Sequence, residues 1–268
     1  MPSAAALRIE IERALDRRFP AALTPVPRTI QETATTGVPE VDALLDGGLP
    51  VGAISEVTGP QSSGRTGLAL SFLAQQTQDE RVCAWVDTGD AFDPESAAAS
   101  GVSLRQLLWM RCRDVSTVNA KNGSRISSGW KAKTGAQVWT RLDQALRATD
   151  LLLQASGFAA IVLDLGDMAP EHGSRIPLAT WFRFRQAADR TRCCLVVLGQ
   201  AAYAQSSAAV VLECAPCKPH TAGGTVLNSF SFEVRRERQR FGPGMQGSRK
   251  PPVSTWSATS AWEAEERA

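Results

Sequence analysis

The sequence predicts an α/β fold in which helices flank a mostly parallel central sheet. Apolar, strand-like runs alternate with amphipathic helical segments along most of the chain, and this alternation is typical of βαβ units whose strands are buried on both faces. The chain has 268 residues, of which 43% are hydrophobic, enough for one sizeable domain or two small ones. The last predicted strands follow one another as in hairpins, so mixed edge strands are expected.

Each element is predicted from its own pattern of apolar residues. An amphipathic helix is expected over about 5–18, where Leu7, Ile11 and Leu15 form one stripe, and a short helix around Val41–Leu45 ends at Gly47. Strands are predicted at Ala53–Val57, Val82–Asp87, Leu107–Arg111, Ala159–Asp164, Cys194–Leu198, Ala209–Glu213 and Val226–Arg235. Helices are predicted at Thr66–Gln76, Pro94–Ala99, Trp139–Ala155 and Ile176–Arg190.

Three parts of the chain are expected to differ in organisation. Residues 1–35 read as an N-terminal helix and a Pro-rich linker, 36–240 as the core, and 241–268 as a flexible tail rich in Gly, Pro and Ser. Within the core, 115–137 carries Lys and Arg but no acid and interrupts the alternation, so it is predicted to be a mobile insertion.

Composition excludes several classes of protein. The chain carries 29 Lys and Arg against 27 Asp and Glu, a net charge of +2, so it is not a polybasic, histone-like protein. No apolar run approaches the ~18 residues that a membrane-spanning helix needs, and the first residues lack a signal-peptide pattern. A cytoplasmic protein with no membrane partner is therefore expected. Six cysteines are too few for a disulfide scaffold, so most are predicted to be buried thiols.

A glycine-bounded loop between a predicted strand and a predicted helix is the strongest functional signal. It follows the GxxxxGK[ST] pattern, whose backbone N–H groups surround phosphate oxygens beside a helix N-terminus. Arg65 stands at the lysine position and keeps the charge, but its planar guanidinium cannot act as a compact point charge. A glycine-rich turn without a ligand is the alternative. The predicted nucleotide-binding loop consists of Gly59, Pro60, Gln61, Ser62, Ser63, Gly64, Arg65 and Thr66.

This loop, the segment Thr36–Gly52 before it and the segment Cys83–Pro94 after it together resemble the RecA recombinase core, over about 36–240. The resemblance implies a RecA-like P-loop fold that binds ATP with Mg²⁺. It places Thr66 and Asp164 around the metal, through nucleotide and water. A strand-end acid that faces solvent is the alternative for Asp164.

The same resemblance assigns further roles and shows two departures. It makes Asp93 an adenine contact and Gln200 a sensor of the γ-phosphate, whereas the position of the family's stacking aromatic is Ser96. The catalytic glutamate of the family is replaced by Gly89, which leaves Asp90 as a weak candidate for the general base. Hydrolysis is therefore expected to be slow or absent.

Two arginines near the end of the core, Arg236 and Arg238, match lysines that reach a neighbour's nucleotide in RecA filaments; an exposed basic strand end is the alternative. The chain also looks similar to the ImuA-type accessory proteins of mutagenic translesion synthesis. That resemblance implies a role in the bacterial SOS response to DNA damage, with RecA filaments and translesion polymerase components as partners. A divergent recombinase with DNA-stimulated ATPase activity is the alternative.

Two further clusters are weighed against simpler explanations. Cys214 and Cys217 with His220 have metal-like spacing, but no second pair of ligands accompanies them, which favours a buried strand-end turn. Basic residues are concentrated in 115–137 and 235–250. Either segment could contact single-stranded DNA, and a solvated insertion is the alternative for the first.

Overall fold

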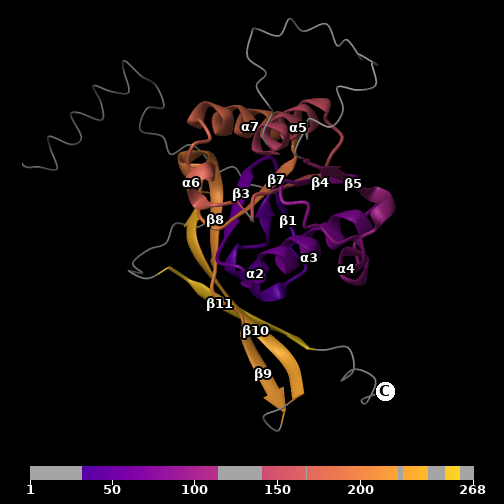
Figure 1. The fold of residues 1–268 in the computed structure, drawn as a ribbon, viewed down its shortest axis with the longest axis vertical. Coiled ribbons are helices and arrows are strands. Elements are labelled where there is room, and N and C mark those ends of the chain that lie inside the picture. Colours follow the sequence, from indigo (N-terminus) through magenta and orange to yellow (C-terminus); the bar gives the residue numbers. More distant parts are fainter. Residues whose placement is uncertain (1–31, 114–140, 167, 223–225, 241–250, 260–268) are drawn as a thin grey trace, which may run out of the picture. The chain divides into compact units, whose positions relative to one another are not determined.

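The computed structural model describes residues 32–113, 141–166, 168–222, 226–240 and 251–259, and these form an α/β fold around one large sheet (Figure 1). Its strands, in sheet order, are β11 (Val253–Thr259), β10 (Val226–Gln239), β8 (Ala208–Cys214), β3 (Ile54–Thr58), β7 (Cys194–Gly199), β6 (Ala160–Asp164), β4 (Cys83–Asp87) and β5 (Leu107–Arg111). β9 (Lys218–Ala222) pairs with β10. The six strands from β8 to β5 are parallel, and β10 adds an antiparallel edge. The predicted fold class is confirmed.

The central strands are buried on both faces, which explains why they read as continuous apolar runs. Side chains of a strand alternate between the two faces of the sheet, and in β6 Val162 packs in one hydrophobic cluster while Ile161 and Leu163 pack in another. Cys83, Cys112, Cys193, Cys194 and Cys214 are buried, which confirms the predicted buried thiols. Burial raises the pKa of the Cys83 thiol to about 12.

Helices cover both faces of the sheet (Figure 1). The helices and short helical turns are α2 (Pro39–Leu44), α3 (Arg65–Gln78), α4 (Pro94–Ala99), η1 (Leu104–Gln106), α5 (Arg141–Ala155), α6 (Pro170–Gly173), α7 (Leu178–Thr191) and η2 (Gln205–Ser207). α5 and α7 pack side by side on one face, where Trp181 and Phe184 of α7 are fully buried. α3 covers the other face with Phe72 and Leu73, which brings its N-terminus to the carboxyl ends of the strands.

Two expectations about the ends of the core need correction. Residues 253–259, predicted as part of a flexible tail, form β11, which pairs with β10 from Ser229↔Thr259 to Arg235↔Val253. Thr33 and Ala34, predicted as linker, form β1 (Thr33–Ala34), which pairs with β2 (Leu49–Pro50). In both cases the partner strand is distant in sequence, so no local pattern marked the strand. The predicted helix at 5–18 and insertion at 115–137 lie outside the described residues.

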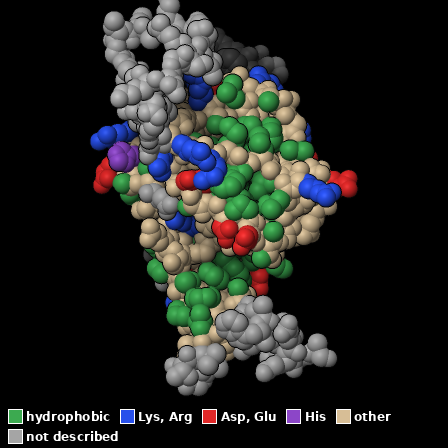
Figure 2. Space-filling model, turned by 45° about the vertical axis from the view of Figure 1, so that its right-hand side comes forward, with side chains coloured by type: hydrophobic (Ala, Val, Ile, Leu, Met, Phe, Trp, Pro, Cys, Tyr) green, Lys and Arg blue, Asp and Glu red, His purple; other side chains and the backbone are tan. Residues whose placement is uncertain are grey.

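The surface on the β5 side exposes apolar side chains. η1 and β5 leave Leu104 and Leu108 about two-fifths exposed, and Figure 2, which brings this side forward, shows hydrophobic side chains gathered there. Among the residues that the structure describes, no helix is both long and apolar enough to span a membrane.

Candidate nucleotide site

The site is built where four parallel strands end together. Thr58 of β3 lies opposite Gly199 of β7, and Asp164 of β6 lies opposite both Leu198 of β7 and Asp87 of β4. In open α/β sheets, ligands bind in the crevice beyond the carboxyl ends of the strands. The loop from Gly59 leaves β3 at this edge and leads directly into α3.

A cavity of about 220 Å³ opens at this edge. It brings together four of the predicted site residues: Arg65, Thr66, Asp93 and Asp164. Its wall is completed by Leu70, Trp85, Ala91, Phe92, Ser96, Gly166 and Leu198. Arg65, Thr66 and Asp164 line it at β6 and at the loop Gly59–Thr66, which is called the phosphate loop after its sequence pattern. The part at Phe92 is apolar and aromatic but also carries Asp93 and Ser96.

Arg65 does not extend into solvent. Its side chain is buried, with the residue only 8% exposed, and Nη1 donates to the carbonyl oxygen of Gly199 at 2.5 Å. The same carbonyl accepts the N–H of Gly59 at 3.2 Å. The guanidinium therefore fastens the start of α3 to the end of β7, a position that the sequence pattern could not reveal.

The phosphate loop is packed tightly against the strands beyond β8. Gly64 has φ +84° and directly precedes α3, and a Cβ placed on it would lie 2.5 Å from the ring of Phe232 in β10. Phe232 in turn stacks on Trp256 of β11, with ring centroids 5.4 Å apart. The carbonyl of Ser62 accepts the N–H of Cys217 at 3.1 Å. Phe232 and Trp256, which the sequence pattern did not single out, thus help to hold the loop.

Asp93 caps a helix at the cavity and leaves its carboxylate exposed there. Its carboxylate caps α4 by accepting from the N–H groups of Glu95 and Ser96 and from the Ser96 hydroxyl. The hydrogen bond from the Ser96 side chain is the main reason that its pKa lies below the ordinary aspartate range. The exposed carboxylate remains ionised at neutral pH beside the apolar end of the cavity.

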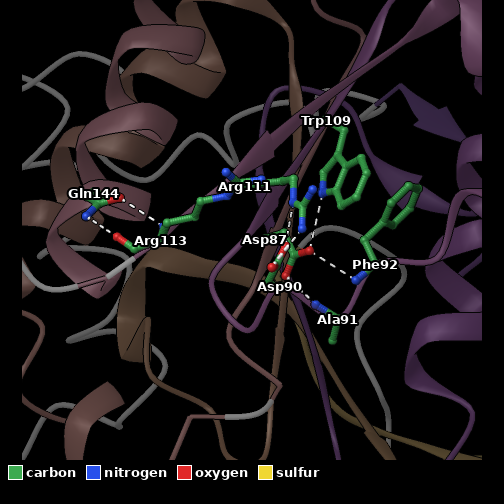
Figure 3. Close-up of polar contacts among 8 residues, drawn as sticks. All are labelled: Asp87, Asp90, Ala91, Phe92, Trp109, Arg111, Arg113 and Gln144. Atoms are coloured by element: carbon green, nitrogen blue, oxygen red, sulfur yellow. Dashed lines mark hydrogen bonds and ion pairs between the residues drawn. The ribbon is translucent and has the colours of Figure 1, made fainter. Parts of the chain in front are cut away.

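Asp90, the weak candidate for the general base, points elsewhere (Figure 3). Its carboxylate forms a two-pronged ion pair with Arg111 of β5, at 2.5 and 2.8 Å, and it is not part of the cavity lining. The hydrogen bond from Arg111 is the largest cause of a lowered pKa at Asp90. A base with a lowered pKa that is already paired with a guanidinium is poorly suited to activate water.

The neighbouring Asp87 is fully buried and organises the loop after β4 (Figure 3). It accepts from the N–H groups of Ala91 and Phe92 at 3.1 and 3.0 Å, and from the indole N–H of Trp109 at 3.2 Å. Phe92 is thereby placed between Trp85 and Trp109, with centroids 4.9 and 5.3 Å away. Asp87 thus positions the aromatic wall of the cavity.

The segment after β7 is held by its own Gln200 and by Glu56 of β3. Gln200 donates its amide to the carbonyl of Gly166 at 3.2 Å, and it does not line the cavity. Glu56, buried in the middle of β3, accepts from the N–H groups of Tyr203 and Ala204 at 2.6 and 2.9 Å. The sequence signal for Glu56 is a single charged residue within an otherwise uncharged buried strand.

Glu56 makes a testable contribution to pH-dependent stability. Burial is the main cause that raises its pKa above 4.5. A carboxyl with a raised pKa in the folded state binds more protons folded than unfolded, so its contribution to stability falls as the pH rises through and above 4.5. The free energy of unfolding of Glu56→Gln, relative to the unsubstituted chain, should therefore increase from acid to neutral pH, measured by urea denaturation.

The matched control is Glu213→Gln, which removes an exposed carboxylate from the neighbouring strand β8. If the difference in the free energy of unfolding between Glu56→Gln and the unsubstituted chain does not change with pH, the raised pKa of Glu56 is contradicted.

Arg236 and Arg238 are both engaged within the chain. Arg236 donates to the carbonyl of Leu44 at the end of α2, and its side chain is 12% exposed. Arg238 donates to the carbonyl of Gln205. These contacts favour a structural role for Arg236 over a contact with a neighbouring subunit's nucleotide.

Comparisons with known proteins agree with this architecture. Residues 6–116 match the RecA N-terminal domain family. The protein RecA of Allorhizobium ampelinum is 31% identical over 184 residues, which cover 63% of this chain and 43% of that protein. RecA of Brucella canis is 29% identical over 207 residues, covering 71% and 50%. The chain therefore spans half or less of the length of these relatives.

The fold is also similar to the crystal structure of the RadB recombinase, with a TM-score of 0.56 and 17% identity, covering 83% of this chain and 94% of that one. This likeness concerns the fold alone. The sequence match and the two relatives show that this chain is similar to RecA proteins, and its fold agrees with that similarity.

Proposed function

We propose that this chain is a RecA-like, nucleotide-binding accessory factor in the bacterial DNA damage response, with weak or no ATP hydrolysis. The observation that carries the proposal is the cavity in which Arg65, Thr66, Asp93 and Asp164 meet. Its volume of about 220 Å³ is below the ~300–1,000 Å³ of whole-ligand pockets. It would therefore hold part of an adenine nucleotide, with the remainder over the loop.

Each end of the cavity supports this ligand. The first N–H groups of a helix have no intrahelical acceptors, and the N-terminus of α3 therefore attracts phosphate oxygens. Thr66 adds a hydroxyl at that end. The apolar end, with Phe92 and Leu70, suits a planar base, and Asp93 supplies an acceptor for an exocyclic amine. RecA-like proteins generally use ATP.

The state of the two positions considered for the general base supports binding over turnover. Gly89 stands where the family resemblance expects the catalytic glutamate, and Asp90 is paired with Arg111. The finer role follows from the ImuA-type resemblance: nucleotide binding would affect contacts with RecA filaments or translesion polymerase components.

Two measurements on the full-length chain test the proposal. Equilibrium titration with a fluorescent ATP analogue should show saturable binding, and steady-state ATP turnover should stay at background with or without single-stranded DNA. Asp90→Ala should leave turnover unchanged. No detectable binding would overturn the nucleotide-binding role. DNA-stimulated turnover that Asp90→Ala abolishes would instead favour a divergent recombinase.

Partner binding needs its own test. Purified chain should be retained by immobilised RecA filaments or by a translesion polymerase complex, and ATP should change the amount retained. Retention by neither partner would contradict the accessory role while leaving nucleotide binding intact.

A further inference from the structure

The charge arrangement at the phosphate end of the cavity differs from what a bound magnesium ion needs. Thr66 and Asp164 both line the cavity, as a magnesium site would require. Mg²⁺ binds through oxygen ligands at about 2.0–2.1 Å in near-octahedral geometry and keeps several of its waters. Those waters need space beside the Asp164 carboxylate.

The Arg65 guanidinium and that carboxylate both approach Gly166. A Cβ placed on Gly166 would lie 3.0 Å from Asp164 Oδ1 and 3.3 Å from Arg65 Nη2. The carboxylate and the guanidinium therefore flank the same glycine. Because Arg65 is buried and its Nη1 is bound to Gly199, the cation is held at the ends of β6 and β7.

A fixed cation at this point opposes a second one. Like charges repel more strongly where water is excluded, so the buried guanidinium disfavours a divalent cation beside Asp164. A lysine could not do the same, because its ammonium has a single nitrogen. The planar guanidinium of Arg65 places Nη1 at the carbonyl of Gly199 and Nη2 near Gly166.

We propose that Arg65 replaces Mg²⁺ as the charge partner of Asp164, so that this chain binds adenine nucleotide without a divalent cation. The inference rests on the proposed nucleotide binding and adds to it a specific property of Arg65. The positive charge that a metal would bring to the phosphates is supplied instead by the side chain and by the N-terminus of α3.

The test compares the affinity of the full-length chain for a fluorescent ADP analogue in Mg²⁺ and in EDTA. The dissociation constant of the unsubstituted chain should change by less than about threefold, whereas Arg65→Lys should bind at least about tenfold more tightly with Mg²⁺ than without it. Adding Asp164→Asn to Arg65→Lys should abolish this dependence. Asparagine keeps a side-chain oxygen to accept from the N–H of Gly166, as Asp164 Oδ1 does at 2.9 Å.

A second readout follows the metal directly. Electron paramagnetic resonance measures how much Mn²⁺ is bound in the presence of ADP. With the unsubstituted chain, no Mn²⁺ should be bound beyond the amount that ADP binds alone. With Arg65→Lys, additional Mn²⁺ should be bound.

The outcomes separate the two proposals. Nucleotide binding that is at least about tenfold tighter with Mg²⁺ in the unsubstituted chain would overturn the inference and leave nucleotide binding standing. Arg65→Lys that binds equally with and without Mg²⁺ would overturn the role of Arg65. No binding by the unsubstituted chain under either condition would overturn the proposed function together with the inference.

Discussion

Asp87→Ala should lower the free energy of unfolding by about 3 kcal/mol or more, because it leaves donors without an acceptor and each buried unsatisfied group costs about 1–3 kcal/mol. Asp87 is fully buried and accepts from three groups: Ala91 N–H, Phe92 N–H and Trp109 Nε1. Urea denaturation followed by circular dichroism measures the loss. The substitution should also weaken nucleotide binding, since Asp87 positions Phe92 in the cavity wall.

Two further variants test this explanation. Asp90→Asn, three residues away, removes only the partly exposed pair with Arg111 and should change stability far less. Asparagine tolerates the positive φ of 57° at this position. Trp109→Phe removes one of the three donors and should lie between the other two variants. Equal losses for Asp87→Ala and Asp90→Asn would show that the buried hydrogen bonds do not organise this loop.

Gly64→Ala should destabilise the chain by about 2–4 kcal/mol and weaken nucleotide binding, because both the backbone and the packing oppose a side chain there. Gly64 has φ +84°, which L-residues rarely adopt, and its Cβ would lie 2.5 Å from the Phe232 ring. The ring cannot easily move away, since it is stacked on Trp256. Chemical denaturation and titration with the fluorescent ATP analogue measure the two effects.

Gly67→Ala provides the matched control within the same helix start. A Cβ on Gly67 meets nothing within 4 Å, and alanine stabilises a helix by roughly 0.5–1 kcal/mol relative to glycine. Adding Phe232→Ala to Gly64→Ala should recover part of the stability that Gly64→Ala alone loses, because it removes the clash but not the backbone strain. Similar stability for Gly64→Ala and Gly67→Ala would contradict the packing described for this loop.

Local sequence signals predicted most elements of the sheet and helices. The strands β4, β6 and β7 are short runs buried on both faces, so their residues are apolar apart from the aspartates that end β4 and β6. α4 was predicted with its observed bounds because Asp93 caps it and Pro94 follows at the first helical position. β11 was missed because Ser and Thr alternate with its few apolar residues, and its strand conformation depends on pairing with β10.

The candidate site, like the fold, was predictable only where its residues form a recognisable motif in the sequence. The loop Gly59–Thr66 could be singled out because its spacing follows a recognisable pattern, and the resemblance to the RecA core pointed to Asp93 and Asp164. The packing of Phe232 against Gly64 could not be predicted, because 168 positions separate these two residues in the sequence. Glu56 and Asp87 likewise gain their roles from hydrogen bonds to loops that come together only in the folded chain.

The sequence by itself determined the α/β fold class and predicted the glycine-bounded loop with Arg65 at its lysine position, and the resemblance to RecA marked Gly89 at the position of a glutamate. The tertiary structure alone decided where those charges lie: the Arg65 guanidinium at Gly199 beside Asp164, and Asp90 on Arg111 away from the cavity. The physical reason is that periodicity and spacing are local properties of the chain. The partners of a long charged side chain depend instead on which strand ends the sheet brings together.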